Sequence, residues 1–297
     1  MLPQKIRDIN FLKRRGLEAY RVWTSPFRLI PNFLIIGVQK GGTTSLYRYL
    51  EEHPSVAGAF AKEVHFFDNH TRDHKYGKGM SWYRSHFVYD AYRLYHRLAY
   101  QQDLITGEGS PDYIFDVHAP NRIAANLPKA KIIILLRDPV DRAYSHYLHN
   151  TRAEWDPDRE KLSFEDAIAA EPERLQGEYE KLMQNEDYFS YNYMHYSYVK
   201  RGLYAKQLKT WFKLFPRDQF LVLKSEVFFA QSAQTFQQVL NFLELPSWEP
   251  KEFQLFNTRT ERSTSLSPQI RRELKQYFCP YNLELRELIG SSFEWDS

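Results

Sequence analysis

Apolar residues along this chain fall into short continuous runs and into longer stretches with helical spacing. Residues 32–37 form a continuous run that ends in glycine, as is typical of a strand buried on both faces of a parallel sheet. Three further runs of this kind lie at residues 104–107, 131–136 and 220–223. Helical spacing is found at residues 44–52, 121–126, 139–150, 164–183, 203–215 and 233–243. Strands that alternate with helices predict an α/β domain with a central parallel sheet flanked by helices.

Two segments stand apart from this alternation. Residues 1–30 are a basic lead-in with apolar positions at roughly helical spacing, which predicts a helix that packs on the domain or lies on an acidic membrane surface. Residues 156–200 are charged and rich in tyrosine, which predicts a helical insertion. We therefore expect one domain over residues 31–297, with this insertion and with a preceding lead-in.

Composition narrows the class of protein. The 43% hydrophobic and 26% charged fractions of the 297 residues are those of a globular chain and exclude disorder. A run of eighteen apolar residues and the apolar core of a secretory signal are both missing from the sequence. The single cysteine, Cys279, allows no internal disulfide and no zinc site of paired cysteines, so we expect a cytoplasmic protein. A net charge of +3 is too small to indicate nucleic-acid binding, and the oligomeric state stays open.

The segment GVQKGGTTS, residues 37–45, joins the first predicted strand to the first predicted helix. A glycine-rich loop followed by a helix N-terminus is a site where backbone amides bind phosphate. The spacing of Gly37 and Gly42 matches a Walker A loop, but Thr43 stands where a nucleotide triphosphatase has lysine. The lysine is instead Lys40, inside the loop. The pattern predicts an anion site that differs from that of a triphosphatase.

The strand at residues 131–136 ends in Arg137 and Asp138. In a magnesium-dependent kinase we would expect an acidic metal ligand directly after such a strand. Arginine at this place suits direct contact with an anion, and Asp138 is positioned to cap the helix that begins at Pro139. The sequence therefore predicts no metal ion at the site.

Together, GVQKGGTTSLYRYL and LLRDPVDRAYSHY resemble the sulfotransferases that use 3′-phosphoadenosine 5′-phosphosulfate (PAPS). The resemblance implies PAPS as the cofactor and a sulfotransferase domain with a P-loop-like sheet. Around the 5′-phosphosulfate it implies Lys40, Gly41, Gly42, Thr43, Thr44 and Ser45, and at the 3′-phosphate Arg137 and Ser145. Two further cofactor candidates come from segments that match the family less closely, Tyr204 and Arg262.

Three more segments resemble the heparan sulfate N- and 3-O-sulfotransferases: KEVHFFD at residues 62–68, KGMSWY at 78–83 and GEGSPDY at 107–113. In that branch, the glutamate at the position of Glu63 is the proposed general base. Gly109 replaces a lysine of the animal enzymes' active site, so the resemblance leaves the acceptor specificity of this chain open. The missing cysteines and membrane anchor indicate a soluble, bacterial-type relative.

The resemblance implies transfer of a sulfuryl group to a hydroxyl or amine, with a carbohydrate or glycan as the expected acceptor. Lys40 would stabilise the leaving phosphate. Glu63 would take the acceptor proton, for which burial or an acidic neighbour would have to raise its pKa. His65 is the competing base, and in an alternating strand it would share a face with Glu63. Lys62 could contact sulfate oxygens, but a solvated lysine is the simpler expectation.

Other functions remain open at this point. The acceptor of a sulfotransferase could instead be the hydroxyl of a lipid or of a secondary metabolite. A magnesium–ATP phosphotransferase of related fold would require metal-dependent turnover of ATP. A non-catalytic glycan-binding protein would bind glycan without any dependence on a nucleotide.

Overall fold

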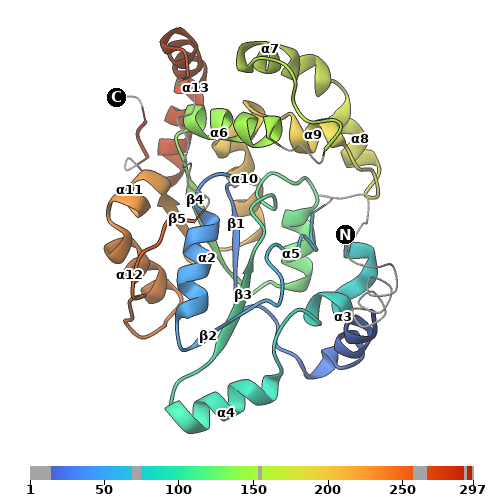
Figure 1. The fold of residues 1–297 in the computed structure, drawn as a ribbon, viewed down its shortest axis with the longest axis vertical. Coiled ribbons are helices and arrows are strands. Elements are labelled where there is room, and N and C mark those ends of the chain that lie inside the picture. The colour runs from blue at the N-terminus through green and yellow to red at the C-terminus, as the bar shows by residue number, and fades with distance from the viewer. Residues whose placement is uncertain (1–14, 69–74, 153–155, 257–265, 291–292, 296–297) are drawn as a thin grey trace, which may run out of the picture.

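A computed structural model of the chain describes residues 15–68, 75–152, 156–256, 266–290 and 293–295. Five parallel strands form one sheet in the order β2-β3-β1-β4-β5 (Figure 1). The strands are β1 (Phe33–Gly37), β2 (Val56–Gly58), β3 (Ile105–Gly109), β4 (Lys131–Leu136) and β5 (Phe220–Lys224). The α-helices that follow β1 in the chain are α2 (Thr43–Glu52), α3 (Gly79–Arg84), α4 (Asp90–Tyr100), α5 (Ala119–Asn126), α6 (Pro139–Thr151), α7 (Phe164–Arg174), α8 (Glu178–Gln184), α9 (Tyr191–His195), α10 (Tyr204–Leu214), α11 (Ser225–Ala230), α12 (Ser232–Phe242) and α13 (Pro268–Ile289).

The central strand β1 is buried along its whole length, and its side chains alternate between two apolar layers. Phe33 and Ile35 pack with residues of α2, α11 and α12 on one face of the sheet. Leu34 and Ile36 pack with residues of α5 and α10 on the other face. A strand covered on both faces reads as a continuous apolar run, which is why the sequence identified β1 so clearly.

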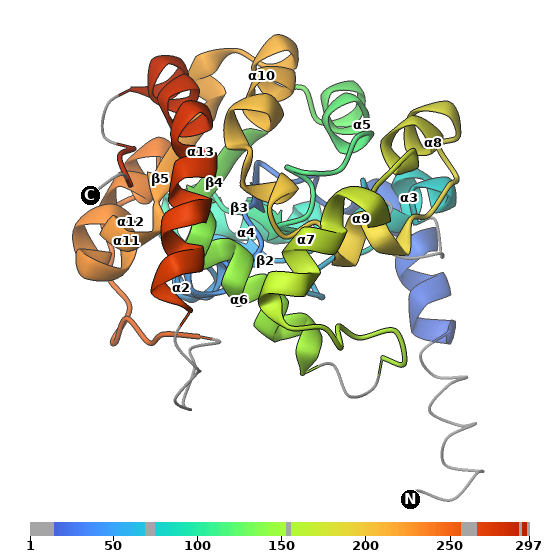
Figure 2. The same ribbon diagram turned by 90° about the horizontal axis from the view of Figure 1, so that it is seen from above.

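A third apolar cluster joins α6, α7 and α13 at the end of the sheet where the parallel strands finish (Figures 1 and 2). The segments that follow β1, β3 and β4 all begin at this edge, because parallel strands have their carboxyl ends together. In open α/β sheets this edge is where ligands bind. No helix in the described ranges is both long and apolar enough to cross a membrane.

The four predicted strands are confirmed, as is the fold class. The three-residue strand β2 was not predicted, because so short a run gives no pattern. The predicted helix over 164–183 is instead two helices, α7 and α8, since Gly177 interrupts it with φ of +72°. Residues 156–200 do contain helices, α7 to α9, and residues 15–23 are helical. The boundary between the lead-in and the domain stays a prediction.

Candidate functional site

The loop between β1 and α2 is folded tightly against the end of β4. The Val38 amide donates to the Leu135 carbonyl at 2.9 Å, and the Gly41 amide donates to the Val38 carbonyl at 2.8 Å. A Cβ atom on Gly41 would lie 2.7 Å from the Leu135 carbonyl oxygen, and Gly42 has φ of +97°. Both positions therefore require glycine, one for close approach and one for its left-handed backbone.

The loop leads directly into the N-terminus of α2, where backbone amides become available for an anion. The backbone ladder of α2 begins when the Leu46 amide donates to the Gly42 carbonyl at 3.2 Å. The amides of Thr43, Thr44 and Ser45 precede it, at the positive end of the helix. Lys40, with φ of +69°, lies in the same loop. This donor set of amides and an ammonium fits a phosphate group.

Arg137 connects the end of β4 to the loop. Its guanidinium donates to the Lys40 carbonyl at 3.0 Å, and the Tyr204 hydroxyl donates to the Arg137 carbonyl at 2.8 Å. The Asp138 carboxylate accepts from the amides of Val140 and Asp141, which confirms that it caps α6. The cation is thus fixed beside the loop at the edge of the sheet.

Not every predicted cofactor residue presents its side chain to this edge. Ser45 is fully buried and its hydroxyl accepts from the Phe256 amide at 3.1 Å. Tyr204 is 1% exposed, and its hydroxyl is used by the Arg137 carbonyl. Both hydroxyls thus have partners within the protein, and the roles of Ser45 and Tyr204 at the nucleotide stay predictions. Ser145 lies buried in α6, and Arg262 falls outside the described residues.

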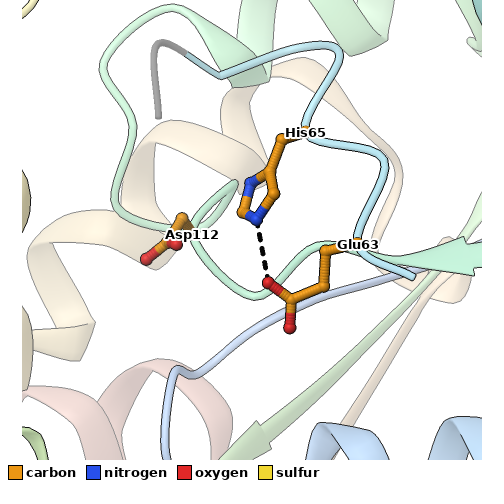
Figure 3. A group of neighbouring side chains, drawn as sticks. All are labelled: Glu63, His65 and Asp112. Atoms are coloured by element: carbon orange, nitrogen blue, oxygen red, sulfur yellow. Dashed lines mark ion pairs between the residues drawn. The ribbon is translucent and has the colours of Figure 1, made fainter. Parts of the chain in front are cut away.

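Three residues of the segment 62–68 form a chain of charged contacts. His65 Nε2 lies 2.9 Å from a Glu63 carboxylate oxygen, and His65 Nδ1 lies 2.7 Å from Asp68 Oδ2. Figure 3 shows the imidazole directed at the Glu63 carboxylate. The expected alternating strand is wrong, because the segment is irregular and His65 has φ of +51°. The turn nevertheless brings both candidate bases into contact.

A buried carboxylate, Glu108 on β3, holds this segment in place. Glu108 is 1% exposed and accepts hydrogen bonds from the hydroxyls of Ser110, Tyr113 and Tyr83 at 2.8–2.9 Å. Ser110 Oγ in turn accepts from the His65 backbone amide at 3.1 Å, and the Tyr113 hydroxyl accepts from the Phe66 amide at 2.9 Å. Burial raises the pKa of Glu108, against the hydrogen bonds that lower it.

The charges around Glu63 and His65 perturb both groups. Burial alone would raise the pKa of Glu63, but the hydrogen bond from His65 and the charge of Lys62 outweigh it and lower the pKa. Burial alone would lower the pKa of His65, but the charge and hydrogen bond of Asp68 and the hydrogen bond with Glu63 raise it well above its ordinary value. His65 is therefore a cation at neutral pH, held between two carboxylates. The expectation that the pKa of Glu63 is raised is wrong.

Two further groups face this centre and were not among the predicted site residues. Asp112, in the loop after β3, lies close to Glu63 and His65 (Figure 3) and forms a buried ion pair with Arg201. Burial lowers the pKa of His149, on α6, and the positive charge of Lys40 adds to this effect. The motif around Asp112 was visible in the sequence, but its pairing with Arg201 joins positions 89 residues apart.

Glu63, His65 and Asp112 also have the spacing of metal ligands, with ligand atoms within 4.8 Å of one another. Their chemistry argues for another use. The imidazole faces one carboxylate from each ring nitrogen, and Arg201 and Lys62 pair with Asp112 and Glu63. The positive charge that a metal would supply here comes from side chains instead. The prediction that no metal takes part remains a prediction.

Comparisons with known proteins agree with this geometry. A family profile described as "Sulfotransferase domain" matches residues 31–276. Human heparan sulfate glucosamine 3-O-sulfotransferase 5 is 28% identical over 286 residues, which cover 90% of this chain and 74% of that protein. Mouse bifunctional heparan sulfate N-deacetylase/N-sulfotransferase 1 is 30% identical over 285 residues, covering 87% of this chain but only 29% of that longer protein.

A solved structure shows the same fold. The crystal structure of a sulfotransferase from Alicyclobacillus acidocaldarius superposes with a TM-score of 0.62 at 31% identity, covering 88% of this chain and 96% of that one. These findings confirm the resemblance of the sequence to PAPS-dependent sulfotransferases and to the heparan sulfate branch. The chain belongs to the sulfotransferase family and is a sulfotransferase enzyme.

Proposed function

We propose that this enzyme transfers a sulfuryl group from PAPS to a hydroxyl or amine of a carbohydrate acceptor, without a metal ion. The observation that carries the proposal is the convergence of two groups of residues at one edge of the sheet. The phosphate loop with Arg137 supplies cations and amides, and the Glu63–His65–Asp68 chain supplies a carboxylate beside them. Lys62 joins the two groups, since its ammonium contacts both Thr44 and Glu63.

The nucleotide would be held by the amides at the start of α2 and by the cations Lys40 and Arg137. When bound, PAPS supplies the sulfuryl group and is converted to adenosine 3′,5′-bisphosphate. Lys40, in the loop, offers an ammonium for the charge that grows on the leaving phosphate. Arg137 offers a rigid fork of donors that suits a phosphate dianion.

Glu63 would accept the proton of the acceptor. Its lowered pKa keeps it a carboxylate across the physiological range, so it is always in the state that can accept. A weak base is sufficient when the proton leaves late, because a hydroxyl becomes strongly acidic as its oxygen bonds to sulfur. His65 orients the Glu63 carboxylate through Nε2, and Asp68 fixes the imidazole through Nδ1. We therefore assign the base to Glu63 and the positioning role to His65.

The acceptor is proposed from the relatives. Two of them carry heparan sulfate glucosamine or heparan sulfate in their names, which favours a glycan that contains glucosamine. Sulfation of a lipid or secondary-metabolite hydroxyl would appear as transfer to such molecules and not to glycans in an acceptor screen. Location in the cytoplasm stays a prediction.

The nucleotide assignment is tested by thermal-shift titration with adenosine 3′,5′-bisphosphate, beside ATP with magnesium. A ligand that binds the folded state raises the melting temperature by mass action. We expect a shift with the bisphosphate that a chelator does not change, that Arg137→Ala weakens, and that the exposed Lys129→Ala leaves intact. A shift only with ATP and magnesium would favour a phosphotransferase. Glycan binding with no nucleotide response would favour a non-catalytic glycan-binding protein.

We also propose that the lead-in contacts an anionic membrane surface. Trp23 and Phe27 are 78% and 69% exposed, a high exposure for large apolar side chains. Arg15 and Arg21 lie on the helix over residues 15–23, which also carries Trp23, and residues 1–30 are basic overall. Aromatic and basic side chains together suit a lipid interface. Co-sedimentation with vesicles that contain phosphatidylserine tests this, with Trp23→Ser expected to weaken binding and neutral vesicles expected to bind poorly. Equal binding to both vesicle types would contradict it.

A further inference from the structure

The sequence favoured a solvated Lys62, but the structure places it between the phosphate loop and the candidate base. Only 9% of its side chain is exposed. Its ammonium lies 3.4 Å from Thr44 Oγ1, in the first turn of α2, and 3.2 Å from Glu63 Oε1. It also lies 5.8 Å from the centre of the Tyr47 ring. An ammonium that is this well buried requires partners of opposite charge or polarity.

Gly109 borders the space that the Lys62 side chain occupies. Gly109 ends β3 and pairs in register with Ile35 of β1. A Cβ atom on Gly109 would lie 3.8 Å from Lys62 Cε, 3.5 Å from Tyr47 Cδ2 and 3.6 Å from Ile35 Cβ. These are ordinary contact distances, so alanine fits here without strain. A longer side chain at position 109 would compete with the Lys62 side chain for the same space.

The partners of Lys62 within the described residues do not use all of its donors. An ammonium has three N–H groups, and the Thr44 hydroxyl and the Glu63 carboxylate accept two of them. Glu63 is also in contact with the cationic His65, so one carboxylate is shared between two cations. The ammonium itself lies between the N-terminal end of α2 and the carboxylate that would receive the acceptor proton. A group that carries negative charge and passes between these two places would lie against it.

We propose that Lys62 is a catalytic residue that holds the non-bridging oxygens of the sulfuryl group during transfer, and that Gly109 makes room for it. The inference rests on the proposed function. In the step, the bond from sulfur to the bridging oxygen breaks and its electron pair stays on the leaving phosphate. The bond from the acceptor oxygen or nitrogen to sulfur forms, and the acceptor proton passes to Glu63. Lys62 exchanges no proton and acts through its charge.

The test compares three replacements in the full chain. Lys62→Met keeps the length of the side chain and removes the charge. Lys129→Ala removes an exposed lysine that precedes β4, at the opposite end of that strand from Arg137. The third, Lys62→Ala with Gly109→Lys, returns an ammonium to the same space from the neighbouring strand. The measurements are kcat and KM with PAPS, the affinity for adenosine 3′,5′-bisphosphate, and the melting temperature. The bisphosphate lacks the sulfuryl group and therefore separates the two parts of the nucleotide site.

For Lys62→Met we expect kcat to fall by about 100-fold, the scale of one lost donor to a developing charge, with bisphosphate affinity within about twofold of the wild type. The double replacement should recover at least about tenfold of the lost kcat, whereas Lys129→Ala should match the wild type. Normal kcat in Lys62→Met would overturn the inference, and so would an equal loss of bisphosphate affinity. If the wild type binds no bisphosphate, the proposed function fails first, and the inference falls with it. A normal wild type with an unaffected Lys62→Met rejects only the inference.

Discussion

Replacement of Asp68 by asparagine tests the conclusion that His65 is a cation held between two carboxylates. The Asp68 side chain is completely buried, and its Oδ2 atom lies 2.7 Å from His65 Nδ1. Asparagine keeps the size of the side chain and an oxygen that accepts a hydrogen bond, but it removes the negative charge. The charge and hydrogen bond of Asp68 are the main causes that raise the pKa of His65 against the effect of burial. In Asp68→Asn, the pKa of His65 should therefore fall.

The size and sign of the effect follow from linkage between protonation and folding. A hydrogen bond between charged groups contributes about 1.5–3 kcal/mol, so the free energy of unfolding should fall by roughly 2 kcal/mol at about pH 6. In the wild type, the pKa of His65 is higher in the folded state than in the unfolded state. The stabilisation that charged His65 contributes is complete below about pH 6.5, its pKa in the unfolded state. It is lost as the pH rises through the higher pKa of His65 in the folded state. The difference between wild type and variant should thus be largest at low pH and shrink as pH increases.

Urea denaturation of both proteins over a pH series from about 6 to about 10 measures this difference. Asp187→Asn is the matched control, because Asp187 is exposed, and its unfolding free energy should follow that of the wild type at every pH. A loss in Asp68→Asn that is the same at all pH values would refute the reasoning. A loss that grows with pH would refute it as well, since the sign would be reversed.

Three further predictions concern the phosphate loop and the base. Lys40→Ala and Arg137→Ala should each weaken binding of adenosine 3′,5′-bisphosphate by at least about tenfold, measured by calorimetry, and unchanged affinity in both would contradict the assignment. Gly42→Ala should lower the unfolding free energy by about 1–2 kcal/mol, because φ at this position is +97° and a Cβ atom would meet the Phe229 ring. Urea denaturation measures this difference, and wild-type stability in the variant would argue against this loop geometry. Glu63→Gln should abolish turnover and leave bisphosphate affinity nearly intact, and near-normal turnover would move the base to His65. Because the pKa of Glu63 is lowered, the wild-type rate should decline only when the pH falls below the usual pKa range of a glutamate.

The features of the fold that could be predicted from the sequence depend on local patterns. The run at β1, the glycines at 41 and 42 and the capping aspartate Asp138 each determine their own backbone within a few residues. They appear in the sequence as a run of apolar residues, a spacing of glycines and an aspartate directly before a predicted helix. The position of the glycine-rich loop and four of the five strands could therefore be predicted from the amino-acid sequence alone.

The features that could not be predicted depend on contacts between distant segments. Glu108 supports the His65 segment through Ser110 and Tyr113. The same carboxylate accepts from Tyr83, which lies 25 residues earlier, and no local pattern marks that pairing. Lys62 is buried beside Gly109, the last residue of β3, and no local pattern marks that contact. The pKa of Glu63 is lowered by cations that the fold brings beside it, whereas the sequence pointed only to burial and acidic neighbours, which would raise it.

The most direct test of the central claim is a sulfuryl-transfer assay with PAPS labelled on the sulfuryl group. The acceptors are a glucosamine-containing glycan, a lipid alcohol and a panel of small hydroxylated compounds, and each reaction is run with and without a chelator. We predict label on the glycan at a rate that the chelator does not change, and none with Glu63→Gln. Transfer that requires a metal ion, or that proceeds normally in Glu63→Gln, would contradict the account.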